Sequence, residues 1–166
     1  MDHAASARAL AEDGADVAIS YATSVDKAEE IIRELEGKGV RAAGFRVNHA
    51  ESSEVEELVK TVVERFGHLD ILVNNAGVFI TGTVDNPEND IAAFERQYAI
   101  NFESAVIAIR AAAKVIGDGG RIITVGSSVG TRAGFAGVAD YTATKAAIAG
   151  YTRGAARDLE IGRAHV

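Results

Sequence analysis

The sequence predicts an α/β protein built around a doubly wound parallel sheet. Amphipathic helical segments alternate with short apolar segments along the 166-residue chain, and this alternation favours parallel strands joined by right-handed helical crossovers. The apolar segments are bounded by glycine or polar residues, as strands covered on both faces usually are. No internal repeat or linker is visible, so we expect one domain over residues 1–159.

The first half of the chain is expected to run helix, strand, helix, strand, at residues 4–12, 16–21, 25–38 and 40–47. Gly14 ends the first helix, as glycine commonly does at a helix C-terminus. The second helix carries its apolar residues at helical spacing on one face. A third helix is expected at 52–66, with Ser52 as its N-cap and a stripe of valine and leucine facing the core.

The second half repeats the alternation. We expect strands at 69–73 and 121–125, a long helix with a bend between them at 91–116, and a final helix at 139–159. The turn between the long helix and the next strand is rich in glycine. Such an order implies a parallel sheet with helices on both faces.

Composition excludes several classes of function. The net charge is −7, without a basic stripe, so we expect no nucleic-acid partner. The chain has no cysteine, and its histidines (His3, His49, His68 and His165) lack ligand spacing, so we expect no metal. No apolar run approaches the roughly 20 residues that span a bilayer, and the start resembles no signal peptide. We therefore expect a cytoplasmic protein without a membrane partner.

Tyr141 and Lys145 are the strongest candidates for chemistry. Their spacing of four places them on one face of the last predicted helix. A neighbouring ammonium favours the ionised phenolate, so the pair can exchange a proton with a carbonyl or alcohol oxygen. Taken alone, such a pair is more often part of a solvated helix face.

Two polar segments follow predicted strands. Ser127 and Ser128 come after strand 121–125, and Asn74-Asn75-Ala76-Gly77 comes after strand 69–73. Ligands of parallel sheets bind at the carboxyl ends of the strands, where a hydroxyl can bond a substrate oxygen and small residues let a ligand approach the backbone. The alternatives are a polar loop start and an ordinary turn.

Asn101 lies inside the long apolar helix, where asparagine is mildly unfavourable. A buried water or a backbone partner should compensate for it.

Together, these four features resemble the short-chain dehydrogenase/reductase family, especially its 3-oxoacyl reductases, over residues 4–159. The resemblance implies a Rossmann-like fold and hydride transfer between a nicotinamide cofactor and a carbonyl or secondary alcohol. It implies that Tyr141 is the general acid/base, that Lys145 favours its phenolate and holds the nicotinamide ribose, and that Ser128 polarises the carbonyl. Asn101 would position a water linked to Lys145, and Asn75, Ala76 and Gly77 would line the cofactor site beside the adenosine ribose.

The resemblance also bears on cofactor choice. Family members that prefer NAD usually carry an acidic residue after the second strand, where this chain has Tyr21. Thr23 and Ser24 offer hydroxyls there, so NADP(H) is expected, with NAD(H) as the alternative. Asn48 stands where the family usually has aspartate beside the adenine. His49 could approach the adenosine, although a solvated loop histidine is the commoner case.

Other features depart from the family. The first strand and the Gly-rich phosphate loop that it carries are expected to be missing, with Met1-Asp2-His3 at the loop's end. Strands 16–21 and 40–47 would then have no hydrogen-bonded link to 69–73. The last strands are expected to be missing too, and residues 160–166 to be a non-native tail. The competing function is therefore a non-catalytic or inactive fragment that retains only the fold.

Partners and substrate follow from the same resemblance. The helices at 91–116 and 139–159 would pair across subunits, so a homodimer or homotetramer is expected. The substrate would be a small carbonyl or alcohol bordered by Val78, Phe79 and the loop 129–138, and its identity is not readable from the sequence.

Overall fold

The computed structural model describes residues 4–159 and 164–165 of the chain. They divide into two compact units, residues 1–48 and residues 49–166. The expectations about residues 1–3, and those about tail residues 160–163 and 166, lie outside the described residues. Both units have the α/β architecture with parallel strands that the sequence predicts.

The first unit is a two-stranded parallel sheet with two helices. Its elements are α1 (Ala5–Glu12), β1 (Val17–Tyr21), α2 (Val25–Glu36) and β2 (Ala42–Arg46). β1 and β2 pair in register from Val17 with Ala42 to Tyr21 with Arg46. The left-handed turn after α1 falls on Gly14, at φ +86°, a conformation that costs glycine little.

Small and branched side chains form the core of this unit. The buried cluster draws on both helices and both strands: Ala7, Ala11, Val17, Leu35 and Ala42. Exposed ion pairs join α1 to the region of α2, with Arg8 bonding Glu34 and Lys38 bonding Glu12. Such exposed pairs contribute little, about 0–1 kcal/mol each, so the buried cluster holds the two helices on the sheet.

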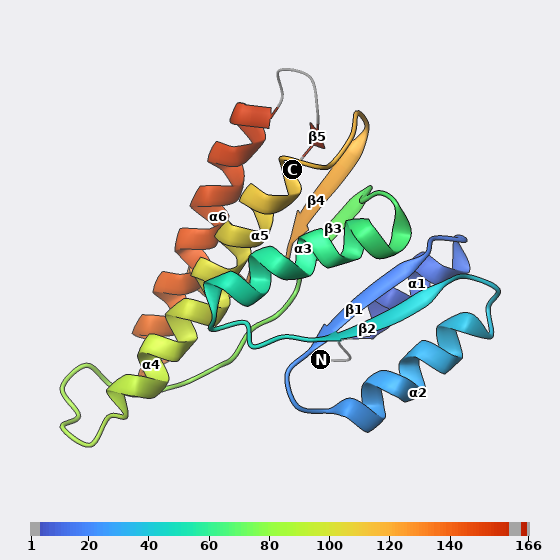
Figure 1. Ribbon diagram of the computed structural model, residues 1–166. Helices are drawn as coiled ribbons and strands as arrows, with labels where there is room; N and C mark the ends of the chain where they lie inside the picture. The colour runs from blue at the N-terminus through green and yellow to red at the C-terminus, as the bar shows by residue number, and fades with distance from the viewer. Residues whose placement is uncertain (1–3, 160–163, 166) are drawn as a thin grey trace. The chain divides into compact units, whose positions relative to one another are not determined.

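The second unit contains a three-stranded parallel sheet and its longest helices (Figure 1). Its elements are α3 (Ser52–Phe66), β3 (Ile71–Asn74), α4 (Ile91–Tyr98), a π-helix η1 (Ala99–Glu103), α5 (Ser104–Ala112), β4 (Gly120–Thr124), a 3-10 helix η2 (Ser128–Gly130), α6 (Ala139–Leu159) and β5 (Ala164–His165). β4 lies between β3 and β5. β3 and β4 pair in register from Ile71 with Arg121 to Asn74 with Thr124.

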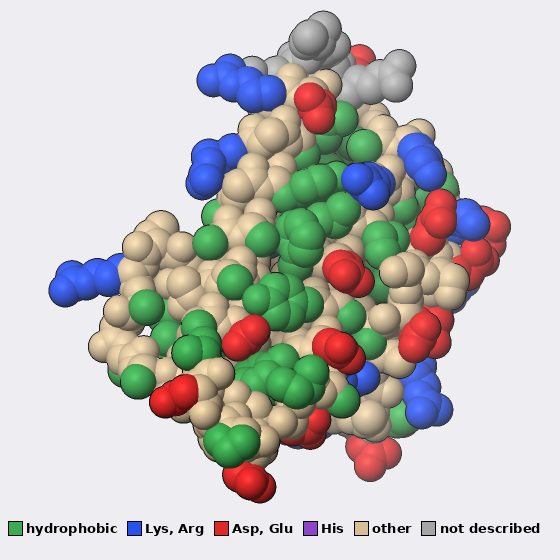
Figure 2. All heavy atoms as spheres, turned by 90° about the vertical axis from the view of Figure 1, so that its left-hand side faces the viewer, with side chains coloured by type: hydrophobic (Ala, Val, Ile, Leu, Met, Phe, Trp, Pro, Cys, Tyr) green, Lys and Arg blue, Asp and Glu red, His purple; other side chains and the backbone are tan. Residues whose placement is uncertain are grey.

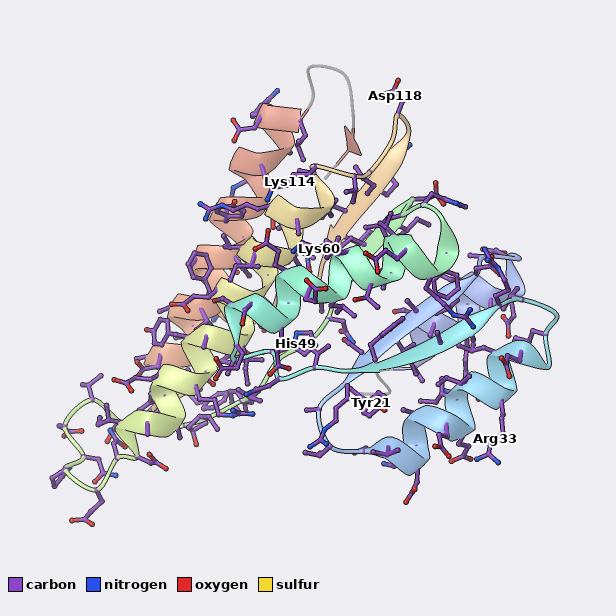
Figure 3. All side chains as sticks on the ribbon, in the orientation of Figure 1. Tyr21, Arg33, His49, Lys60, Lys114 and Asp118 are labelled. Atoms are coloured by element: carbon purple, nitrogen blue, oxygen red, sulfur yellow. The ribbon has the colours of Figure 1, made fainter. Side chains whose placement is uncertain are left out.

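The core of the second unit lies where α5 and α6 meet the sheet. Its buried members come from α5, the turn after it, β4 and α6: Ala105, Val106, Ile109, Ala112, Ile116, Ile122, Ile148 and Ala155. α3 packs against α5, and Lys114 bonds Glu56 of α3 on the surface (Figure 3). Packing against apolar α5 and β4 thus fixes α6, which carries Tyr141 and Lys145.

In place of the helix predicted at 91–116, α4, η1 and α5 follow one another without a break from Ile91 to Ala112. The π-helical turn η1 occupies Ala99–Glu103. The sequence predicts a bend in this helix, whereas the structure has a π-helical turn, and this turn contains Asn101. Single π-helical turns inside α-helices occur frequently at functional sites.

Three local expectations need correction. Ser52 is the first residue of α3 rather than its cap; the cap position is Glu51, whose side chain makes no capping bond. β4 ends at Thr124 rather than at Val125, and Ser128, which follows the strand as expected, begins a 3-10 helix. A short strand at Ala164–His165 pairs with β4, where the sequence predicts no strand.

The gap predicted in the sheet is present. Among the described residues, β1 and β2 form one sheet, and β3, β4 and β5 form another, with no strand hydrogen-bonded to both. Within residues 4–159 and 164–165, no helix is long and apolar enough to cross a membrane.

Candidate active site

Tyr141 and Lys145 lie one helical turn apart near the start of α6. The Lys145 Nζ atom is 5.9 Å from the centroid of the Tyr141 ring. The backbone of α6 thus holds an ammonium beside the phenol, as the spacing of four predicts. Tyr141 is half-buried, so its ring is held on one side and reachable on the other.

Lys145 is anchored at the carboxyl end of β4. Its side chain is buried, and Nζ donates a hydrogen bond to the Val125 carbonyl at 3.0 Å. Burial lowers the pKa of Lys145 from its ordinary value, because desolvation penalises the charged ammonium. A buried lysine with a single protein acceptor has donors left over for another group, which is the arrangement a ligand-binding ammonium requires.

The 3-10 helix Ser128–Gly130 packs directly on the backbone of α6 at Lys145. A Cβ at Gly130 would lie 2.9 Å from the Lys145 carbonyl carbon and 3.1 Å from the Ala146 nitrogen. Only glycine allows the two backbones to come this close. Ser128, at the start of this turn, is exposed, and its carbonyl accepts hydrogen bonds from Thr131 and Arg132.

Asn101 sits in the π-helical turn with its side chain buried. Its Oδ1 accepts from the Val78 N–H at 2.8 Å, and its Nδ2 donates to the Val78 carbonyl at 2.8 Å. Nδ2 also lies 3.3 Å from the Thr144 hydroxyl, which donates to the Tyr141 carbonyl at 2.8 Å. The expectation of a backbone partner for Asn101 is confirmed.

Gln97 is a second buried amide on the same helix, and its role is not predicted from the sequence. It has no solvent exposure, and its Oε1 accepts from the Ile80 N–H at 2.6 Å. The available sequence signal is its spacing: Phe94, Gln97 and Asn101 are three and four residues apart, on the face where the helix buries its side chains.

Phe79 lies between the two backbone positions that these amides hold. Its ring meets the Tyr141 ring edge to face, with centroids 4.6 Å apart and planes at 82°. Edge-to-face contact is a favoured aromatic geometry. About half of the Phe79 side chain is exposed, at 53 %, so Phe79 forms an apolar border beside the Tyr141 ring.

The segment after β3 brings small residues to the same place. A Cβ at Gly77 would lie 3.3 Å from Asn101 Oδ1 and 3.9 Å from Lys145 Nζ. Ala76 and Gly77 are exposed, and Asn75 is half-buried. At the end of the strand, the Asn74 amide donates to the Thr124 hydroxyl at 3.5 Å. This edge therefore offers a surface with little side-chain bulk beside Lys145.

The adenosine-side candidates are more dispersed. Thr23 and Ser24 are exposed in the bend between β1 and α2 of the first unit, and Asn48 is half-buried at the end of that unit. His49 begins the second unit and is not the solvated loop histidine expected: its Nδ1 lies 3.1 Å from the Ser104 hydroxyl (Figure 3). Burial lowers its pKa, partly offset by Glu54, which raises it.

The structure therefore brings Asn101, Tyr141, Lys145 and the segment after β3 together within one unit. Across residues 4–159 and 164–165, no group of three or more His, Asp or Glu side chains could hold a metal ion. A buried ammonium and a half-buried phenol at the carboxyl ends of β3 and β4 suit proton exchange with a bound oxygen.

Comparison with known proteins decides the family. The family model for short chain dehydrogenases matches residues 4–165, nearly the whole chain. The chain belongs to the short-chain dehydrogenase family. The expected doubly wound, Rossmann-like fold is confirmed, because solved short-chain dehydrogenases superpose on it closely.

Two solved structures illustrate the similarity. A short chain dehydrogenase from Burkholderia cenocepacia J2315, in complex with NADP, has a TM-score of 0.93 and is 41 % identical, over 96 % of this chain and 64 % of that one. A blue fluorescent protein from a metagenomic library, in complex with NADPH, has a TM-score of 0.89 and is 42 % identical, over 93 % of this chain and 63 % of that one.

Among curated proteins, a 3-oxoacyl-(acyl-carrier-protein) reductase FabG of Staphylococcus epidermidis is 40 % identical over 154 residues. The match covers 90 % of this chain and 61 % of the reductase. The short-chain dehydrogenase chain described here thus spans about three fifths of the length of that relative.

Proposed function

We propose that this chain carries the catalytic part of an NADP(H)-dependent oxidoreductase that interconverts a carbonyl and a secondary alcohol. The observation that supports this most strongly is Tyr141 one helical turn before the buried Lys145, at the carboxyl ends of β3 and β4. Membership of the short-chain dehydrogenase family supports the same chemistry. The whole protein's substrate is proposed only as a class, a small carbonyl or alcohol.

Tyr141 is proposed as the general acid/base. In the reducing direction its phenolic O–H gives a proton to the substrate oxygen, and in the oxidising direction the phenolate takes that proton back. A nicotinamide held here would supply or accept the hydride at the substrate carbon. Each reduction then consumes one hydride and one proton, so the charges and atoms of the carbonyl-to-alcohol step balance.

Lys145 and Ser128 are proposed to assist from either side. Lys145, fixed by the Val125 carbonyl, has further N–H donors for the nicotinamide ribose and places positive charge near the phenol. Ser128 offers an exposed hydroxyl at the start of the turn that packs on Lys145. Asn101 fixes the Val78 backbone and Thr144, and a water held beside it would link Lys145 to solvent.

The residues present fit the nicotinamide side of a dinucleotide. Gly77 leaves open the space that a Cβ would fill beside Lys145 and Asn101, and the segment from Asn75 to Gly77 is proposed to line the cofactor. Thr23 and Ser24 are proposed to bond the adenosine 2′-phosphate, with Asn48 and His49 near the adenine. Complexes of similar structures with NADP and NADPH favour NADP(H) over NAD(H).

One observation favours the alternative, a chain that keeps the fold without turnover. The described strands form two sheets that share no hydrogen-bonded strand, whereas a dinucleotide normally binds at the carboxyl edge of one continuous sheet. The alternative predicts that the 166-residue chain binds no cofactor by itself, while its catalytic residues still work in an intact sheet.

A homodimer or homotetramer is proposed for the assembly. Figure 2 shows hydrophobic side chains gathered along the face of the molecule where α4 and α6 lie, between acidic side chains. A patch of this kind on an exposed helix pair suits a symmetric interface between identical subunits. We also propose a cytoplasmic location. Light scattering on the whole protein tests the assembly, and a single-subunit mass would contradict it.

The function is tested with a chimera. Residues 4–159 of this chain replace the matching stretch of the Staphylococcus epidermidis reductase, and NADPH oxidation is followed with a 3-oxoacyl thioester and with a simple ketone. The chimera is expected to oxidise NADPH with one of these carbonyls, and Tyr141→Phe is expected to reduce the rate at least about a hundredfold. Unchanged turnover in Tyr141→Phe would exclude the proposed mechanism.

A further inference from the structure

We propose that Gln97 is a positioning residue that sets Phe79, and through it the Tyr141 ring, in the active site. The inference rests on the proposed function, because it concerns the same tyrosine. It starts from two buried amides of one helix, Gln97 and Asn101, that bond the same short backbone segment.

The hydrogen bonds fall on alternate residues. Asn101 bonds both the N–H and the carbonyl of Val78, and Gln97 accepts from the N–H of Ile80. The bonds thus hold the backbone on both sides of Phe79, which restricts the direction in which its side chain leaves the segment. The result is the 4.6 Å edge-to-face contact of Phe79 with Tyr141.

The helix is shaped for this double contact. Gln97 lies in the last turn of α4, and Asn101 lies in the π-helical turn that follows. A π-helical turn inserts an extra residue and shifts the direction in which the next side chains point. Here it separates the two amides along the helix while both remain buried, at 0 % and 3 % exposure.

Burying the Gln97 amide leaves one of its two polar atoms without a hydrogen bond among the described residues. The Ile80 N–H is a donor, so Oε1 must face it, and the orientation of the amide is settled. Nε2 then has no hydrogen-bond partner among the described residues. A buried donor without a partner destabilises the fold, and an apolar side chain would pack there without that penalty. A glutamine at this position is explained if the Ile80 N–H needs the acceptor that Oε1 provides.

Phe79 connects the backbone segment held by Gln97 and Asn101 to the Tyr141 ring. Phe79 is 53 % exposed, and its ring lies against the Tyr141 ring, so we expect it to border the bound substrate. Small displacements of a positioned group can cost up to about a hundredfold in rate. Without the hydrogen bond from the Ile80 N–H to Gln97, one end of the segment 78–80 is free to move. The Phe79 ring then no longer limits the tilt of the Tyr141 ring.

The test uses the chimera described above. Gln97→Met keeps the volume and removes the acceptor; we expect kcat to fall about tenfold, with the KM for NADPH within about twofold. Gln97→Glu keeps an oxygen facing Ile80 and should recover most of that loss. Glu95→Met, at an exposed position on the same helix, is the matched control and should leave kcat unchanged.

A double-mutant cycle shows whether the effect passes through Phe79. In a Phe79→Ala background, Gln97→Met should have little further effect on kcat, because the ring that it positions is gone. If the two losses multiply instead, Gln97 acts by another route and the inference is wrong. Should Gln97→Met fail to fold, Gln97→Asn, which withdraws the acceptor but keeps the amide, takes its place in the same cycle.

The failures can be told apart. An unsubstituted chimera that oxidises no NADPH would overturn the proposed function and, with it, the inference. An active chimera that loses activity with Tyr141→Phe, but keeps wild-type kcat with Gln97→Met, would overturn the inference alone.

Discussion

Asn101 and Val78 are joined by two hydrogen bonds of 2.8 Å, one accepted and one donated by the same side-chain amide. This pair ties the helix that contains the π-helical turn to the segment that leaves β3. A third contact, from Nδ2 to Thr144, extends the link to α6. One side chain therefore joins the three elements that carry the site.

Replacing Asn101 with leucine should destabilise the fold, because it leaves the N–H and carbonyl of Val78 without partners. We expect the free energy of unfolding to fall by about 1–3 kcal/mol, measured by urea denaturation of the 166-residue chain. Asn101→Asp retains the acceptor for the Val78 N–H and should lose less. Equal losses in the two variants would show that the bonds to Val78 do not stabilise the fold.

Gly130→Ala should also destabilise the chain, because the new Cβ would meet the backbone of Lys145 at 2.9 Å. The strain is expected to cost about 1–3 kcal/mol and to lower the rate of the chimera by moving the Ser128 turn away from Lys145. Gly117→Ala is the matched control, since a Cβ there meets nothing within 4 Å. Similar stability of both variants would contradict the close packing described.

The stability of the chain should depend on His49 below neutral pH. Burial lowers the pKa of His49 below its ordinary 6.5, so between its folded-state pKa and 6.5 the unfolded chain binds more protons than the folded chain. Stability is then fully present above pH 6.5 and falls as the pH drops through that window. In His49→Gln, this part of the acid slope should disappear from the thermal melting curves.

His68→Gln is the control for the pH experiment, because His68 is an exposed residue beside Asp70. It should leave the contribution of His49 in place. A His49→Gln chain with the same acid slope as the unsubstituted chain would rule out His49 as its source.

Cofactor preference should appear as a difference in thermal stabilisation. At about 100 times its dissociation constant, a ligand stabilises the folded state by roughly 2.7 kcal/mol. The chimera is expected to be stabilised more by NADPH than by NADH at equal concentration, because the strand ends in Tyr21 rather than in an acidic residue and Thr23 and Ser24 provide hydroxyls. A larger shift with NADH would contradict the choice of cofactor.

The same titration on the 166-residue chain separates the two proposed functions. No shift with either nucleotide would support the alternative of a chain that keeps the fold without binding, and would confine the activity to an intact sheet. A shift with NADPH would show that the 166-residue chain itself binds the cofactor.

Much of the fold follows from local patterns. The predicted helices and strands differ from the observed ones mainly by a few residues at their ends, because alternation and helical spacing report burial directly. The sequence predicts a bend in the long helix, but it does not predict the π-helical turn. The strand at Ala164–His165 depends on pairing with β4, which no local pattern reveals.

The candidate site divides in the same way. The spacing of Tyr141 and Lys145 and the apolar surroundings of Asn101 are visible in the sequence. The roles of Gln97 and Gly130 are not visible there, because they depend on backbone from distant segments. Gln97 bonds the Ile80 N–H, and Gly130 packs on the Lys145 backbone. Contacts of this kind appear only when the fold brings the segments together.

The central claim is hydride transfer assisted by Tyr141, and the most direct measurement is isotope transfer. The chimera is incubated with the carbonyl that supports turnover and with NADPH deuterated at the transferring position of the nicotinamide. The mass of the alcohol product is then measured by mass spectrometry. The account predicts one deuterium at the carbinol carbon, formed at least about a hundredfold more slowly with Tyr141→Phe. An alcohol without deuterium, or equal rates with and without the Tyr141 hydroxyl, would contradict it.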